Sequence, residues 1–494
     1  MFGLDISEIG LYHISKRAAL VICTLRDFTP AKGLRSTMDY DVIVIGGGSA
    51  GYAAARTASD LGGKVAIVDK GPLGGLCILR GCMPSKTLLR TSDVMSLMKR
   101  AKEFGLRAQK LGVDMAAIND RKRALIKEFA DYRAEQLQQP QYNLIQGKAQ
   151  FLDAHTIDVD GKTCTAKAFI ITTGSNHARI PVPGLEEAGY ITSDEALDAR
   201  TLPKSMIVLG GGPVATELGQ FYCRLGTRTT LIQRSDHILS AGDEDLARPV
   251  EDSLRHDGMK VFTGTRIKNV TRKEGRTTVV FEHEAKQRRA TADVLFNGLG
   301  REPSIQGLDL EAAGVELDGR RIHVDETMST NVPHIFAAGD VVGLHEIVHI
   351  AIQQGEVAGH NAMSTDTQRV DYRLKAEVTF TDPAVASVGQ SEKECRLEKR
   401  PCLVASYPFD DHGKSMVMGE TRGFVKILCD PVSGEILGGH IVGPEAGELI
   451  HELIAFMYFR GTVMDLAQMP HYHPTLSEIV TYPAEDLAEQ IEAQ

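Results

Sequence analysis

Two cysteines, Cys77 and Cys82, stand five positions apart in the segment Gly74-Gly-Leu-Cys-Ile-Leu-Arg-Gly-Cys-Met-Pro-Ser-Lys86. Positions i and i+5 diverge in a regular α-helix, so a bond between the two sulfurs requires a distorted turn, which Gly81 can supply. A thiol pair near a helix start is expected to contain an acidic thiolate and to cycle between dithiol and disulfide. We therefore predict a redox-active pair. A structural disulfide and an idle reduced pair are the alternatives.

The same pair is a poor zinc site because no second pair of cysteines stands at ligand spacing, and we expect no metal. The remaining cysteines are scattered singly, which is typical of small buried hydrophobes or idle thiols. They are Cys23, Cys164, Cys223, Cys395, Cys402 and Cys429.

The thiol pair follows a strand–turn–helix pattern. Residues 41–45 read as a buried strand that runs into a glycine-rich turn, a helix is expected over 52–61, and a second strand over 65–68 ends at Asp69. An acidic residue about twenty positions after such a turn is typical of a βαβ unit that binds a dinucleotide. An unrelated glycine turn is the alternative.

Each residue of this turn has an expected task. Gly46 permits the tight turn, Gly48 lets the backbone approach a pyrophosphate beside Ser49, and Gly51 allows close helix packing. Asp69 is placed to accept a hydrogen bond from a ribose hydroxyl.

The unit recurs in the segment Met206-Ile-Val-Leu-Gly-Gly-Gly-Pro-Val-Ala215. Gly210 and Gly212 repeat the first two glycines, and Ala215 replaces the third with another small residue that permits close packing. The chain is therefore expected to bind two dinucleotides.

The second unit ends in Gln233 and Arg234 where a carboxylate is expected for NAD. A carboxylate would repel a 2′-phosphate and an arginine would attract it, so Arg234 favours NADP(H) over NAD(H). A solvated surface charge is the alternative for Arg234.

Length and charge narrow the class of protein. A chain of 494 residues exceeds the ~250–300 residues at which single cores stop growing, so several domains are expected. The formal charge of −10 argues against a nucleic-acid partner. The sequence has no apolar run of the ~18–20 residues that a membrane span needs, and we expect a cytoplasmic protein with no membrane partner.

These motifs, with several others, resemble the pyridine nucleotide–disulfide oxidoreductase family, which holds dihydrolipoamide dehydrogenase, glutathione reductase and mercuric reductase. The resemblance covers about residues 38–494. The other matching segments are Thr173-Gly174, Gly300-Arg301-Glu-Pro303, Ile335-Phe-Ala-Ala-Gly339-Asp340, Phe380-Thr-Asp-Pro383 and His473-Pro-Thr-Leu-Ser-Glu478.

The resemblance implies an α/β fold with two Rossmann-like dinucleotide-binding domains, for FAD and NAD(P), and a C-terminal α+β dimerisation domain. The expected divisions are an N-terminal extension over 1–37 that is disordered or not native, an FAD-binding domain over 38–165 and 292–365, an NAD(P)-binding domain over 166–291, and a dimerisation domain over 370–494.

The resemblance also implies roles for single residues. Asp340 would hydrogen-bond the FAD ribityl chain, and Lys86 would lie beside the flavin and pair with Glu217. Cys82 would face the flavin as a thiolate, and Cys77 would exchange with the substrate. Thr173, Gly174, Gly300 and Gly339 would belong to the cofactor sites.

His473 and Glu478 supply what thiol exchange needs, a base that titrates near neutrality and a carboxylate that orients it. In the family this histidine comes from the partner subunit, so the resemblance implies a homodimer whose active site is shared.

The substrate is expected to be a small disulfide or dithiol, and the motif order is most like dihydrolipoamide dehydrogenase. Arg234 and the insert Ile78-Leu79-Arg80 depart from that enzyme, and Arg80 points to an anionic or unusual substrate. A glutathione-type or mercuric reductase using NADPH is the alternative, although the C-terminal cysteine pair of mercuric reductase is absent after Cys429. A non-catalytic redox sensor or complex subunit is a hypothesis of another class.

Overall fold

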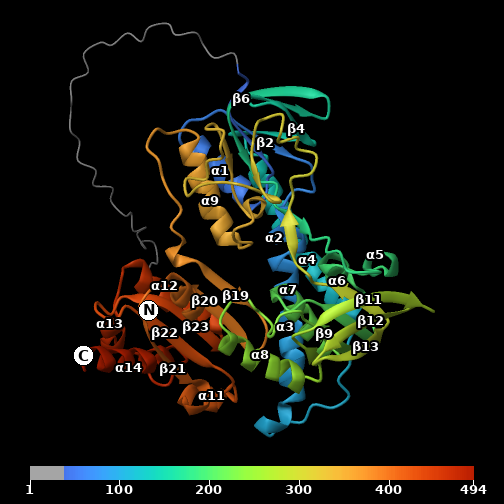
Figure 1. The fold of residues 1–494 in the computed structure, drawn as a ribbon, viewed down its shortest axis with the longest axis vertical. Coiled ribbons are helices and arrows are strands. Elements are labelled where there is room, and N and C mark those ends of the chain that lie inside the picture. Colours follow the sequence, from blue (N-terminus) through green and yellow to red (C-terminus); the bar gives the residue numbers. More distant parts are fainter. Residues whose placement is uncertain (1–37, 494) are drawn as a thin grey trace, which may run out of the picture. The chain divides into compact units, whose positions relative to one another are not determined.

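A computed structural model describes residues 38–493 (Figure 1). The predictions about residues 1–37, and Cys23 with them, lie outside the described residues. Within the described part, no helix is both long enough and apolar enough to cross a membrane.

The first sheet is built around β1 (Tyr40–Ile45), which pairs in parallel with β2 (Val65–Asp69) and β6 (Lys162–Ile171). The middle of β1 is fully buried, as expected of a parallel strand covered on both faces. The strand order is β3-β2-β1-β6-β5-β4, with β18 also against β6. The other strands are β3 (Tyr142–Gln146), β4 (Ala149–Asp153), β5 (Thr156–Val159) and β18 (Ile335–Ala337).

Helices α1 (Ser49–Asp60) and α9 (Val348–Asn361) lie side by side next to this sheet (Figure 1). A Cβ atom added at Gly355 would lie 2.2 Å from the carbonyl oxygen of Ala50, so the two backbones are in direct contact. This contact fixes the helix that begins at the first glycine turn.

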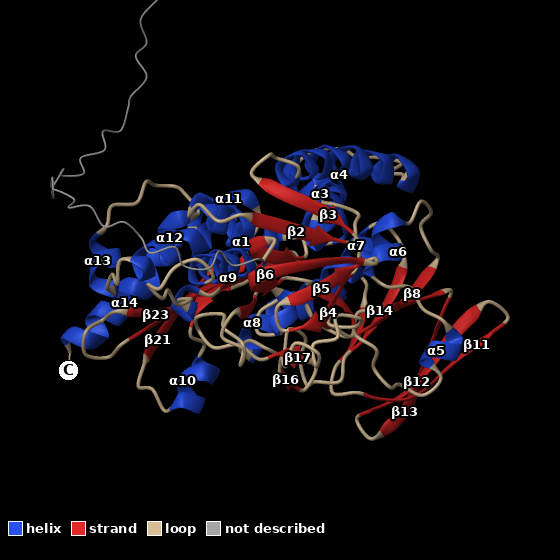
Figure 2. Ribbon diagram, turned by 90° about the horizontal axis from the view of Figure 1, so that it is seen from above, coloured by secondary structure: helices blue, strands red, loops and turns tan. Residues whose placement is uncertain are grey.

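Three helices follow β2 in the chain, α2 (Gly75–Arg80), α3 (Cys82–Lys99) and α4 (Met115–Leu137). Figure 2 shows α3 and α4 beside one another. The side chain of Asp114 accepts a hydrogen bond from the Ala117 amide at 3.0 Å and so caps α4. Short elements complete this part: β7 (Ser175–His177), β15 (Arg301–Pro303), β16 (Leu317–Asp318), β17 (Arg321–Ile322) and 3₁₀ turns over Ala101–Phe104 and Asp340–Val342.

The second sheet is parallel, in the order β10-β9-β8-β14, and repeats the βαβ arrangement. Its strands are β8 (Ser205–Leu209), β9 (Arg228–Ile232), β10 (Lys260–Phe262) and β14 (Val294–Asn297), and its main helices are α7 (Pro213–Arg224) and α8 (Glu244–His256). An antiparallel sheet of β11 (Arg266–Lys273), β12 (Arg276–His283) and β13 (Lys286–Ala292) follows, and α5 (Leu185–Ala188) and α6 (Ser193–Asp198) precede β8.

The third sheet is antiparallel, in the order β19-β20-β23-β22-β21, and has its own apolar core. Its strands are β19 (Ala376–Thr379), β20 (Ala384–Gly389), β21 (Leu403–Pro408), β22 (Phe424–Cys429) and β23 (Ile436–Gly443). Its helices are α10 (Glu392–Glu398), α11 (Gly413–Met418), α12 (Ala446–Tyr458), α13 (Val463–Gln468) and α14 (Thr481–Glu492), with 3₁₀ turns over Tyr372–Leu374, Phe409–Asp411 and Ser477–Val480. The pattern is the α+β arrangement that the sequence predicts for its C-terminal part.

Strand pairing corrects two of the expected domain boundaries. The boundary after residue 165 falls inside β6, whose pairing with β1 continues to Ile171. The boundary before residue 292 places β14 in the first domain, whereas β14 pairs with β8 of the second sheet. The two nucleotide-binding units therefore divide after β6 and after β14, because a strand belongs to the sheet that satisfies its backbone hydrogen bonds.

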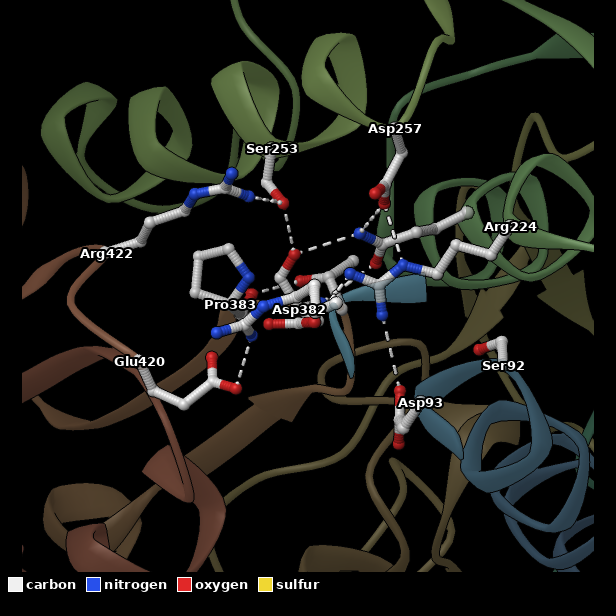
Figure 3. A network of polar contacts seen from close by, with 12 residues as sticks. Ser92, Asp93, Arg224, Ser253, Asp257, Asp382, Pro383, Glu420 and Arg422 are labelled. Carbon is white, nitrogen blue, oxygen red and sulfur yellow. Dashed lines mark hydrogen bonds and ion pairs between the residues drawn. The ribbon is translucent and has the colours of Figure 1, made fainter. Parts of the chain in front are cut away.

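Arg224, the last residue of α7, joins three parts of the chain (Figure 3). Its side chain is 4% exposed and forms ion pairs with Asp257 at 2.7 Å, Asp382 at 2.5 Å and Asp93 at 3.5 Å. One turn earlier, Gln220 exchanges two hydrogen bonds with the backbone of Asp382, at 2.8 and 2.9 Å. One face of α7 therefore holds the loop between β19 and β20 beside α3.

Candidate active site

The two redox cysteines lie on either side of a break between helices. Cys77 is in α2, Cys82 is the first residue of α3, and Gly81 between them has φ −121° and ψ −118°. A Cβ atom at Gly81 would lie 2.9 Å from the carbonyl oxygen of Leu76 and 3.0 Å from the Cα atom of Cys77. The distorted turn predicted from the spacing is present, and the glycine permits the close approach.

Both cysteines are free thiols in this structure. The pKa of Cys82 is lowered to about 6, first by a hydrogen bond from the Cys77 thiol and then by the charge of Lys86, while burial acts in the opposite direction. The pKa of Cys77 is raised, because its proton is held by Cys82 and because it is buried. The arrangement makes Cys82 the thiolate and Cys77 the proton donor at neutral pH.

Lys86 lies one turn after Cys82 and pairs with Glu217 of α7, as predicted. The Nζ atom is 2.9 Å from one carboxylate oxygen and 3.1 Å from the other. Glu217 is nearly buried and also accepts a hydrogen bond from the amide of Phe380 at 2.9 Å. The Lys86 Nζ lies 4.6 Å from the centre of the Phe380 ring, so the ammonium is fixed by a carboxylate and an aromatic face.

The first glycine turn has the features that a pyrophosphate needs. A Cβ atom at Gly51 would lie 1.8 Å from the carbonyl oxygen of Gly46, so the turn closes directly on the helix. Gly48 begins α1 without a side-chain cap, no acidic residue occupies the first helical turn, and a Cβ atom added at Gly48 would meet only the Cα atom of Gly75, at 3.9 Å. The free amides of a helix start, Ser49 among them, fit an anion.

Asp69 ends β2 as predicted, and its carboxylate is anchored by the backbone. One oxygen accepts from the Gly47 amide at 2.6 Å, and the other accepts from the Gly71 amide at 2.6 Å. A carboxylate has about four acceptor positions, so capacity for a ribose hydroxyl remains.

Asp340 lies at the end of β18, next to the turn that contains Thr173 and Gly174. Its Oδ2 atom accepts a hydrogen bond from Ser175 Oγ at 2.6 Å, and Ser175 Oγ accepts from Arg301 Nε at 2.8 Å. Thr173 donates to the carbonyl oxygen of Ser304 at 2.7 Å. Gly174, Gly300 and Gly339 have φ of 72°, 116° and 80°, which favours glycine at these positions.

The second glycine turn repeats the first. A Cβ atom at Gly210 would lie 2.4 Å from the carbonyl oxygen of Gly298, and Ala215 fills the place of the third glycine against the same residue. Gly212 begins α7 without a side-chain cap or a first-turn acid. Arg234 is exposed at the end of β9 and forms no ion pair with another described residue.

His473 and Glu478 form the predicted pair. His473 Nδ1 lies 3.1 and 3.2 Å from the two oxygens of Glu478, and the imidazole is 77% exposed. Glu478 also contacts Nε2 of the buried His412 at 3.3 Å. Burial lowers the pKa of His412, so Glu478 is left as the negative partner of His473.

Within the described chain, the structure joins some of the predicted residues and separates others. The two cysteines, Lys86 and Glu217 lie together, whereas no hydrogen bond or ion pair connects His473 to either cysteine. The sequence reasoning missed the contacts of Phe380 and His412. Phe380 was part of a recognised segment, but no local signal pairs it with Glu217.

Family models match almost all of the described residues. Residues 40–355 match the pyridine nucleotide-disulphide oxidoreductase model, and residues 375–484 match the dimerisation domain of the same group. The chain belongs to this family. It is therefore an FAD-dependent pyridine nucleotide–disulfide oxidoreductase whose C-terminal domain is a dimerisation domain.

Relatives from several bacteria carry different activities in their names. The chain is 36% identical to a dihydrolipoyl dehydrogenase of Thermus scotoductus, covering 91% of this chain and 98% of the relative. It is 32% identical to a mercuric reductase of Staphylococcus aureus, covering 89% and 81%. The fold also matches the solved structure of the HOCl-induced flavoprotein disulfide reductase RclA from Escherichia coli, with a TM-score of 0.80, 24% identity and coverage of 90% and 99%.

Proposed function

We propose that this enzyme uses NADPH to reduce a small disulfide through Cys77 and Cys82, with His473 of the partner subunit as the acid and base. The observation that carries the proposal is the difference in pKa between the two cysteines. Cys82 has a lowered pKa beside the Lys86–Glu217 pair, and Cys77 keeps its proton.

The first glycine turn, Asp69 and Asp340 would hold FAD, which when bound supplies two-electron transfer between nicotinamide and the cysteine pair. Lys86 holds a fixed positive charge beside Cys82 and keeps its sulfur ionised. Phe380 and Glu217 keep that ammonium in place.

His473 would move the proton of the exchanging thiol. Because the Glu478 carboxylate only accepts hydrogen bonds, it holds the proton of the neutral imidazole on Nδ1 and leaves Nε2 as the base. Nε2 would take the proton of Cys77 as that sulfur attacks the substrate and return it to the leaving thiolate. Since His473 contacts neither cysteine within its own chain, a partner subunit is the proposed source.

The preference for NADPH rests on Arg234. Its guanidinium is exposed at the end of β9, where it can bind a 2′-phosphate in a bidentate manner. The second candidate is a reaction with NADH like that of the dihydrolipoyl dehydrogenase relatives. It is favoured by the extent of the match, since two of these relatives each match over 91% of this chain.

Steady-state turnover of the FAD-loaded dimer tests the proposal, with NADH and NADPH each measured against lipoamide, glutathione disulfide and mercuric ion. NADPH-dependent reduction of a disulfide is the expected result, and Arg234→Ala should raise the KM for NADPH without changing that for NADH. Efficient turnover with NADH and lipoamide alone would establish the second candidate. Efficient turnover with NADPH and mercuric ion would instead favour a reaction like that of the mercuric reductase relatives.

A further inference from the structure

Arg133 of α4 is a partly buried cation without a counter-ion. Its guanidinium packs over the ring of Tyr52, with 4.3 Å from Cζ to the ring centre. Its Nε atom is buried and has no hydrogen-bond partner, and no described residue forms an ion pair with it. A guanidinium whose face is stacked on a ring can still use the N–H donors in its own plane to bind a planar anion.

The arginines near it are arranged differently. Arg56, one turn after Tyr52 on α1, pairs with Glu356 at 2.5 Å. Arg80, which the sequence suggested as an anion-binding residue, pairs with Asp194 at 3.1 Å and is 58% exposed. Each of these charges already has a partner, so Arg80 is a weaker candidate for the substrate than its sequence position indicates.

Arg133 is also close enough to the redox pair to matter for exchange. Helices α2 and α4 pack against each other, and Cys77 lies near enough to Arg133 to raise its pKa when the Cys77 sulfur is ionised. Burial lowers the pKa of Arg133 because the charge is only partly hydrated. The Nε atom of Arg133 lacks an acceptor, which a carboxylate oxygen can supply. Unsatisfied polar groups of this kind are stabilised when a ligand supplies the missing bonds.

We propose that Arg133 binds an anionic group, such as a carboxylate, of the disulfide that exchanges with Cys77. Arg133 is then a specificity-determining residue on the substrate side of the cysteine pair. This inference rests on the proposed role of Cys77 as the exchanging thiol.

The test uses two disulfides of equal size, dithiodiglycolate with carboxylates and its neutral diamide. Both are mixed with FAD-loaded enzyme carrying Cys82→Ser, which traps the mixed disulfide at Cys77, and the modified Cys77 peptide is quantified against time. We expect the ratio of the carboxylate rate to the amide rate to be roughly tenfold higher in the enzyme that keeps Arg133 than in the same enzyme with Arg133→Met, since hydrogen bonds between charged groups are stronger than those to neutral groups.

Two further variants separate binding from packing. Arg133→Lys should retain part of the preference because it keeps the charge, whereas Arg56→Met should leave the preference intact because Arg56 is already paired. The preference should also fall with rising ionic strength in the enzyme that keeps Arg133, and stay flat in Arg133→Met.

Three results would overturn the inference. An unchanged ratio of the two rates in Arg133→Met, with loss of bound FAD, would assign Arg133 to the flavin, and an unchanged ratio with FAD retained would make it structural. If Cys77 reacts with neither disulfide while Cys82 of the wild-type enzyme does, Cys77 is not the exchanging thiol and the proposed function fails together with the inference. An unchanged ratio of the two rates with a reactive Cys77 overturns only the role of Arg133.

Discussion

At the level of single residues, the reactivity of Cys82 depends on two neighbouring groups that stabilise its thiolate. The Cys77 thiol and the Lys86 ammonium lower its pKa to about 6, so the sulfur is ionised above that pH and protonated below it. Replacing Lys86 with methionine removes one of these groups and leaves the negative Glu217 unpaired.

We therefore expect Lys86→Met to raise the pKa of Cys82 by about one pH unit. The pH dependence of iodoacetamide alkylation at Cys82 measures this directly, because only the thiolate reacts. The alkylation curve should move to higher pH, and a curve that stays in place would refute the role of Lys86. Lys127→Met is the matched control, since Lys127 forms an exposed pair with Asp131 on α4.

His473 gives a second residue-level prediction. His473→Ala should slow disulfide exchange by roughly 10²–10⁴, the range for loss of a general acid and base, while reduction of the flavin by nicotinamide stays fast. Rapid-mixing measurements of the two half-reactions separate these steps. His451→Ala, at an exposed position on α12, controls for the loss of an imidazole, and equal slowing of both half-reactions would contradict the assignment.

At the level of elements, α7 connects the redox pair to the rest of the fold. Glu217, Gln220 and Arg224 lie on one face of this helix and hold the loop over residues 380–382. That loop provides the Phe380 ring beside Lys86. The geometry of the site therefore depends on a helix whose main sequence signal is the glycine turn at its start.

Replacing Arg224 with methionine should destabilise the protein strongly. Arg224 is buried and Asp257 is 14% exposed, whereas Asp93 and Asp382 are 41% and 40% exposed, so the loss is expected at about 3 kcal/mol, the lower end of the range for breaking a buried pair. Thermal unfolding followed by circular dichroism is the measurement. The exposed Arg248→Met on α8, which removes an i,i+4 pair with Glu244, should change the unfolding midpoint little, and equal effects of the two variants would contradict the prediction.

For the whole molecule, the central expectation is that one active site takes residues from two subunits. Cys82→Ser and His473→Ala homodimers should each be inactive in exchange. Mixed dimers formed by refolding the two variants together should regain activity, because one site then combines an intact cysteine pair with an intact His473. Activity that never rises above that of the separate variants would show that each subunit uses its own histidine.

Much of the fold and of the site was predictable because its signals are local. The glycine turns, the spacing of the cysteines and the segment from His473 to Glu478 each fit within a few residues, and backbone geometry alone restricts what they can form. The domain boundaries were less predictable. β6 and β14 look alike as apolar strands, and only hydrogen bonding to β1 or β8 shows which sheet each one joins.

The sequence by itself determined the two nucleotide-binding units, the redox cysteine pair and the pairing of His473 with Glu478. The tertiary structure decided which charges are already paired and which are not. Arg80 and Arg133 are both arginines near Cys77, yet Asp194 neutralises the first while the second lies unpaired on Tyr52. Asp194 and Tyr52 are both distant in the chain from the arginines they contact, so long-range packing, and not residue type or spacing, sets which of the two charges is already paired.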